Sequence, residues 1–278
     1  MLFEIEHLTR YEYTRPVSLD THVMRFRPLQ RSGQRVVAHS LHIVPEPGAV
    51  ETFEDTWGND AVRVHFAHDT TLLEIHAHIA VETSRAAAHV LHDFTLPPPT
   101  VAGGTVAADF VAPLDSAATL EDFLRPLLDS AGRSGLQLLD ALNRAVHAFY
   151  HHDVRIEGEA QRPAQTLAAR SGVCRDLAVL FMAACRHIGL PARFVSGYQR
   201  GDDRRKTRYL HAWPEVYLPA DGWQGFDPTH GERVADTHVA IAAGPTPESV
   251  APVVGSFRFS GEAPQSTLHS EVRIDVSD

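Results

Sequence analysis

The feature that most constrains the fold is a small-residue turn that leads directly into a segment with the periodicity of a buried helix. The turn is Ser171-Gly172-Val173, and Cys174 stands where the helix should begin. Apolar residues then recur at three- and four-residue spacing, which predicts one buried helix face; they are Leu177, Leu180, Phe181, Ala184 and Ile188. Because Gly189 and Pro191 form a stop signal, we expect a helix that begins at Cys174 and ends near residue 188.

The position of Cys174 favours a reactive thiol. A thiol at a helix N-terminus lies among unpaired N–H groups at the positive end of the helix dipole, which stabilises the thiolate. His211 follows in an alternating segment, and Asp227 comes 16 residues later, after a turn. That spacing suits two antiparallel strands that bring a carboxylate beside an imidazole. From residue types and spacing alone, a Cys–His–Asp triad and three residues that never meet are equal alternatives.

The expected strand that carries His211 runs from residue 209 to 218. Its alternation puts His211, Trp213 and Glu215 on one face, which we expect to point toward the Cys174 helix. Pro214 lacks a backbone donor, so the strand should be locally unpaired there or lie at an edge.

The first 83 residues read as β-structure. Short alternating segments are separated by turn signals such as Arg31-Ser32-Gly33 and Trp57-Gly58-Asn59-Asp60, which is typical of an antiparallel β-sandwich. Later, an expected helix that begins near Thr119 and is bent or shortened at Pro126, and expected helices near 135–151 and 163–170, precede the Cys174 helix; expected strands follow from residue 192 onward. The fold class is therefore α+β. We expect a β-sandwich domain at 1–95, a linker at 96–118 and a catalytic core at 119–278.

Composition narrows the function. The net charge is −10, from 25 basic and 35 acidic residues, which argues against nucleic-acid binding or a polybasic membrane contact. No stretch approaches 18 consecutive apolar residues, and the N-terminus lacks the pattern of a signal peptide, so we expect a cytoplasmic protein. Cys174 and Cys185 would lie about 16 Å apart along one helix, too far for a disulfide. Cys185 is interpreted as a core residue.

The 18 histidines raise the question of a metal site. His76-Ala77-His78 and His151-His152 are pairs that could share a metal, but neither has a companion at a familiar ligand spacing. We therefore expect no metal and no organic cofactor.

Three blocks together resemble the transglutaminase-like superfamily. They are Gly172-Val173-Cys174-Arg175-Asp176, His211-Ala212-Trp213-Pro214-Glu215-Val216-Tyr217 and Gly222-Trp223-Gln224-Gly225-Phe226-Asp227-Pro228-Thr229. The leading segment, with His7, Tyr11, Tyr13, Pro16-Val17 and Trp57-Gly58-Asn59, is similar to the N-terminal region of bacterial members. The resemblance implies a papain-like core with Cys174 as nucleophile, His211 as base and Asp227 as the residue that orients the base.

The expected reaction is cysteine-dependent acyl transfer or hydrolysis at an amide bond, through a thioester on Cys174, with a protein or peptide as substrate. Hydrolysis, glutamine deamidation and cross-linking share this thioester and stay open, as does the oligomeric state. The Cys174 N–H is an expected oxyanion donor, and Trp213 and Gln165 are candidates for the second. Arg175 and Asp176 are expected to form a local pair or cap.

Other functions of a cysteine-containing cleft fit these residues less well. An arylamine N-acetyltransferase would typically show an Arg-Gly-Gly approach to the cysteine, which Arg170-Ser171-Gly172 reproduces poorly. A peptide N-glycanase would need further cysteine pairs for zinc. A non-catalytic protein-binding module is the alternative from another class, although it has no need of Cys174, His211 and Asp227 together.

Overall fold

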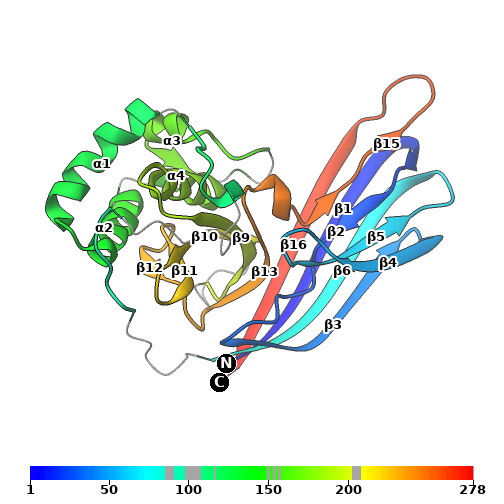
Figure 1. Ribbon diagram of the computed structural model, residues 1–278. Helices are drawn as coiled ribbons and strands as arrows, with labels where there is room; N and C mark the ends of the chain where they lie inside the picture. Colours follow the sequence, from blue (N-terminus) through cyan, green and yellow to red (C-terminus); the bar gives the residue numbers. More distant parts are fainter. Residues whose placement is uncertain are drawn as a thin grey trace.

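The computed structural model describes residues 1–84, 91–97, 108–115, 117–148, 151–152, 155, 158–201 and 208–277. Figure 1 shows two lobes, one of β-strands and one in which helices pack on a smaller sheet. This arrangement confirms the α+β expectation, with a β-sandwich packed on a helix-and-sheet core. The N-terminal strands are β1 (Leu2–Leu19), β2 (His22–Met24), β3 (Gln34–Val44), β4 (Ala49–Glu54), β5 (Asp60–His65) and β6 (Thr70–Thr83).

Two antiparallel sheets form the sandwich. One has the order β15-β1-β6-β3, with β16 also paired to β1, and the other has the order β14-β2-β5-β4. Side chains alternate along β6, so that its buried residues lie on one face, in a cluster with residues of the second sheet and of the other lobe; these are Leu73, Ile75, Ala77, Ile79 and Val81. The period-two pattern in the sequence is thus the cause of the sandwich.

The C-terminal strands belong to the sandwich and correct the expected domain limits. They are β14 (Val253–Val254), β15 (Phe257–Arg258) and β16 (Ser266–Ser277). β16 runs antiparallel to β1 from Leu2↔Ser277 to Tyr13↔Ser266, and Figure 1 shows the two termini side by side. The assignment of 119–278 to a single core is therefore wrong at its C-terminal end, because backbone pairing returns that segment to β1.

The boundary near residue 95 is also displaced. β6 ends at Thr83, and Leu96 packs in a small cluster with Ala131 and Leu138 of the helical lobe. Residues 98–107 and 116 of the expected linker lie outside the described residues. The sandwich is thus built from residues 1–84 and 253–277.

The second lobe contains α1 (Ala117–Ala131), α2 (Gly135–Ala148), α3 (Pro163–Ala169) and α4 (Cys174–His187), with short 3₁₀ helices η1 (Ala108–Phe110) and η2 (Glu248–Val250). Its sheet has the order β12-β11-β10-β9-β13. Its strands are β9 (Ala192–Gln199), β10 (His211–Leu218), β11 (Gly222–Asp227), β12 (Glu232–Arg233) and β13 (His238–Gly244); β7 (His151–His152) and β8 (Ser171–Gly172) form a separate parallel pair.

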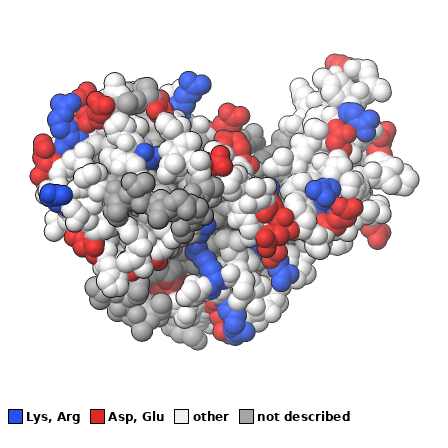
Figure 2. Space-filling view, in the orientation of Figure 1, with Lys and Arg blue, Asp and Glu red and all other residues white. Residues whose placement is uncertain are grey.

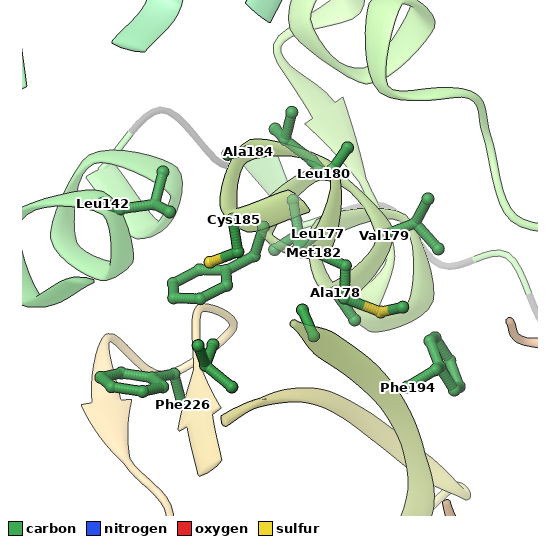
Figure 3. Packing of buried hydrophobic residues seen from close by; sticks show 14 of the residues in the cluster. Leu142, Leu177, Ala178, Val179, Leu180, Met182, Ala184, Cys185, Phe194 and Phe226 are labelled. Atoms are coloured by element: carbon green, nitrogen blue, oxygen red, sulfur yellow. The ribbon is translucent and has the colours of Figure 1, made fainter. Parts of the chain in front are cut away.

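The core of this lobe lies between α4 and the sheet. Figure 3 shows Leu177, Leu180 and Cys185 of α4 packed with side chains of α2 and the sheet. The face of β10 that meets this core is the apolar one, with Ala212 and Val216, and not the face of Trp213 and Glu215. The expected orientation of β10 is therefore wrong for Trp213 and Glu215, which are buried away from α4, although His211 at the start of the strand still reaches Cys174.

Pro214 lies inside the sheet but at a point where the pairing is incomplete. β10 pairs with β9 from His211 to Val216, whereas its pairing with β11 covers Glu215 to Leu218 only. The strand is thus unpaired on the β11 side up to Pro214, which agrees with the expectation that a proline interrupts the ladder.

Surface charge and helix hydropathy relate to the two functions that the composition argues against, nucleic-acid binding and membrane contact. Figure 2 shows basic and acidic side chains interspersed on the visible part of the described surface, without a continuous basic patch there. None of the helices formed by the described residues has the length and hydropathy needed to cross a membrane.

Candidate active site

Cys174 is the first residue of α4 and is partly exposed, as expected. The helix start is held by Asp176, which is fully buried and accepts a hydrogen bond from the Val173 N–H at 2.8 Å. The same carboxylate accepts two bonds from the Arg155 guanidinium, at 2.6 and 2.7 Å. A Cβ on Gly172 would lie 2.9 Å from Asp176, so glycine leaves room for this cap. The Gly172–Asp176 block therefore builds a rigid turn that presents the thiol.

The expected cap by Asp176 is confirmed, but its ion partner is Arg155 and not the neighbouring arginine. Arg175 instead donates to the Arg155 carbonyl oxygen at 3.0 Å.

His211 joins the other two predicted residues. It is the first residue of β10, and its Nε2 donates to Asp227 Oδ2 over 2.8 Å. The Cys174 side chain is close enough to the ring to help raise the pKa of His211. Since Nε2 is bonded to the carboxylate, Nδ1 is the nitrogen left for the thiol. The structure therefore brings together all three residues that the sequence singled out, with Asp227 on the side of the ring away from Cys174.

The electrostatics of the site favour an ion pair. Burial alone would lower the pKa of His211, but the charge and hydrogen bond of Asp227, aided by Cys174, raise it from 6.5 to about 10. Burial would raise the pKa of Asp227, yet His211 and the other donors hold it well below its ordinary value. The imidazolium and the carboxylate stabilise one another, and a positive imidazolium beside the sulfur stabilises a thiolate.

Two further histidines surround Asp227, and sequence reasoning missed both. His230 Nδ1 and His238 Nε2 lie 2.8 and 3.0 Å from Asp227 Oδ2. His230 is partly exposed, while His238 is fully buried. The sequence signals were a histidine three residues after Asp227 and another at the start of the β13 strand. Among 18 histidines neither stood out.

Part of this cluster has the composition of a metal site. The ligand atoms of His211, Asp227 and His230 all lie within 4.8 Å of one another. Two imidazoles and a carboxylate are a donor set that Zn²⁺ accepts. The hydrogen bonds between these groups account for the same closeness without a metal.

The other residues singled out in the sequence are Cys185, Gln165 and Trp213, and none of them forms a hydrogen bond with the triad within the described part of the chain. Cys185 is fully buried, and burial raises the pKa of its thiol, in line with its interpretation as a core residue. Gln165 is exposed and accepts a hydrogen bond from the Arg162 N–H at the start of α3. Trp213 is fully buried, and its indole N–H has no partner among the described residues. A second oxyanion donor is thus not identified by these contacts.

Comparison with known families agrees with this geometry. Residues 130–228 match the model of the transglutaminase-like superfamily, and residues 3–82 match the bacterial transglutaminase-like N-terminal region. The chain belongs to the transglutaminase-like superfamily. The first match spans Cys174, His211 and Asp227, and the second spans the β1–β6 part of the sandwich.

Individual relatives cover the chain to different extents. An uncharacterized protein of Mycobacterium tuberculosis is 26% identical over 279 residues, covering 94% of this chain and 88% of its own. A protein-glutamine gamma-glutamyltransferase of Pseudomonas aeruginosa is 40% identical over 68 residues, 22% of this chain and 10% of its own. A candidate cysteine protease from Cytophaga hutchinsonii has a similar structure, with a TM-score of 0.72, 22% identity, and coverage of 100% of this chain and 92% of that one. This last likeness shows the fold.

Proposed function

We propose that this protein catalyses cysteine-dependent acyl transfer or hydrolysis at amide bonds. The observation that carries the proposal is the His211 ring, which is bonded to the buried Asp227 carboxylate at 2.8 Å and whose pKa is also raised by the neighbouring Cys174 side chain. A nucleophile, a base and a group that orients the base are the parts that acyl transfer requires. A binding module has no physical need to hold a buried carboxylate against an imidazole and a thiol.

The chemistry follows from these positions. The Cys174 thiolate attacks the carbonyl carbon of the amide, and the His211 imidazolium gives its proton to the departing nitrogen as the C–N bond breaks. A thioester on Cys174 remains. Water or an amine then attacks the thioester, His211 takes its proton, and the thiolate leaves. Asp227 holds the ring orientation throughout and stabilises its positive charge.

The substrate class is proposed to be a peptide bond or a glutamine carboxamide of a protein or peptide. Support comes from the name of the Pseudomonas aeruginosa relative, a protein-glutamine gamma-glutamyltransferase, although the likeness covers 22% of this chain. Cys174 is partly exposed, which suits a residue that must meet a substrate, whereas Cys185 is fully enclosed.

The first experiment is intact-mass analysis after iodoacetamide treatment at pH 6, with Cys174→Ala and Cys185→Ala as matched variants. We expect one adduct on the wild type and on Cys185→Ala, and none on Cys174→Ala, because only Cys174 has an imidazolium neighbour. The second is incubation with a glutamine-containing peptide, with and without a primary amine, with release of ammonia as the readout. Equal alkylation of both cysteines, or ammonia release that survives Cys174→Ala, would overturn the proposal.

A further inference from the structure

His238 reaches the catalytic carboxylate from a strand that does not carry the triad. It is the first residue of β13, is fully buried, and its Nε2 lies 3.0 Å from Asp227 Oδ2. Since a carboxylate only accepts hydrogen bonds, Nε2 carries the proton. The other ring nitrogen, Nδ1, lies 3.0 Å from the Thr237 hydroxyl, which supplies the matching donor. Both nitrogens are thus satisfied by a neutral ring in one tautomer.

The neutral form of the His238 imidazole suits this position. Burial lowers the pKa of His238 despite the nearby Asp227 charge. An uncharged donor fixes the carboxylate without competing with His211 for its negative charge. His238 is therefore suited to hold Asp227 in place while His211 carries the positive charge.

The approach of His238 to Asp227 depends on the strand between β10 and β13. Gly197 of β9 pairs with His211 on one side and with Ala240 on the other. A Cβ there would lie 2.2 Å from the Val239 carbonyl oxygen and 2.7 Å from the Trp213 ring. The Trp213 ring in turn packs edge-on against His238, with centroids 5.2 Å apart. Because Gly197 has no side chain, these groups can pack closely against one another.

β13 is the edge strand of its sheet, and two amide side chains from the sandwich pair with its free edge. Asn59 donates to the Ala243 carbonyl oxygen at 3.0 Å and accepts from the Ala243 N–H at 2.8 Å. Gln34 likewise donates to the Ala240 carbonyl oxygen at 2.8 Å and accepts from the Ala240 N–H at 2.7 Å. Both amides are buried, so each pair substitutes for one rung of a missing strand.

We infer that His238 is a positioning residue for Asp227, and that the N-terminal sandwich keeps it in position by clamping β13 through Asn59 and Gln34. The sandwich is then a structural part of the active site. This inference rests on the proposed function for its catalytic meaning. Its effect on Cys174 is measurable without a substrate, since the thiolate depends on the His211–Asp227 pair.

The test begins with two substitutions of His238. His238→Phe keeps the ring volume and removes the donor, while His238→Gln places an N–H near the position of Nε2. The control is His7→Phe. His7 is a buried histidine at the same interface, bonded to the Tyr198 hydroxyl at 2.8 Å, and its contacts do not include Asp227. All four proteins are compared by the alkylation rate of Cys174 at pH 6 and by kcat and KM.

We expect His238→Phe to lower the alkylation rate and kcat by about 10- to 100-fold, the usual cost of losing an outer hydrogen-bond partner, with KM little changed. His238→Gln should recover to within about threefold of the wild type, because a donor is restored. His7→Phe should lower the urea midpoint and leave both rates unchanged. A purely structural role for His238 predicts the reverse order, with Phe tolerated and Gln damaging, and that result would overturn the inference.

The clamp is tested with Asn59→Leu, alone and combined with His238→Phe. Asn59→Leu should lower the Cys174 alkylation rate several-fold, and should add little in the His238→Phe background, since both act through one contact. If the two reductions in alkylation rate multiply in the double variant, the clamp does not act through His238, and that part of the inference would be overturned. A wild-type Cys174 that reacts no faster than a free thiol would refute the proposed function instead, which keeps the two failures distinct.

Discussion

Replacing Glu215 by glutamine tests how strongly one buried carboxylate ties the two lobes together. Glu215 lies on β10, with a side chain that is 3% exposed. It accepts hydrogen bonds from Arg193 at 2.9 and 2.6 Å and from Arg31 of the sandwich at 2.5 Å. The Arg193 guanidinium also lies over the Trp223 ring, 4.4 Å from its centroid. The substitution preserves the shape of the side chain and removes its charge.

The magnitude follows from the pKa of Glu215. Burial would raise this pKa, but the charges of Arg31 and Arg193 lower it from 4.5 to about 2. At 1.36 kcal/mol for each pKa unit, the charged form contributes about 3 kcal/mol to the free energy of unfolding at neutral pH. This agrees with the range of about 3–5 kcal/mol for breaking a buried ion pair by removing one partner.

The lowered pKa of Glu215 also predicts how its contribution to the free energy of unfolding changes with pH. A carboxyl group with a lowered pKa in the folded state stabilises the protein above its unfolded pKa, and this contribution is lost as the pH falls through the folded value. For Glu215 the window therefore runs from pH 4.5 down to about 2. The difference in unfolding free energy between wild type and Glu215→Gln should fall from about 3 kcal/mol at pH 7 to about 1 kcal/mol at pH 3.

The assay is urea unfolding followed by circular dichroism at both pH values. Glu51→Gln is the matched control, because Glu51 pairs with Arg63 at 3.1 Å on the exposed surface, where an ion pair is worth less than about 1 kcal/mol. The reasoning is refuted if Glu215→Gln is no more destabilising than Glu51→Gln at pH 7, or if its effect does not shrink at low pH.

Three shorter predictions follow from the site. Asp227→Asn should lower turnover by about 10²- to 10³-fold with circular dichroism unchanged; the comparable change in a Ser-His-Asp triad costs about 10⁴, and a turnover near wild type would contradict the triad. The His211 ring should lose its proton only near pH 10 in a titration followed by NMR, and a His211 transition near 6.5 would contradict its ion pair with Asp227. Gly197→Ala should lower the free energy of unfolding by about 1–3 kcal/mol, because its Cβ meets a backbone oxygen at 2.2 Å. Gly48→Ala, where the nearest atom is 3.4 Å away, should cost little in the same urea titration.

Local signals in the chain were sufficient for the elements of the site. The start and end of α4, the alternation of β6 and the pair β10–β11 are consequences of periodicity and of glycine and proline within a few residues. Because Cys174, His211 and Asp227 fall at the ends of such elements, their meeting was predictable from spacing together with the resemblance to a known family.

The wrong predictions all concern contacts between distant parts of the chain. Periodicity shows that β10 has an apolar and a polar face, but which face meets α4 depends on what the rest of the chain places on each side. The pairing of β16 with β1 joins residues more than 250 positions apart, and no local pattern specifies such a partner.

The contacts of Asp227 show the same difference between what local sequence patterns specify and what the tertiary structure adds. The sequence determined that a carboxylate ends β11 and that an imidazole begins β10. Only the tertiary structure placed His230 and His238 on the same carboxylate oxygen, and Asn59 and Gln34 on the edge of β13. The physical reason is that a hydrogen bond between buried groups depends on a few tenths of an ångström, and that precision arises only when the packing of both lobes fixes all the strands together.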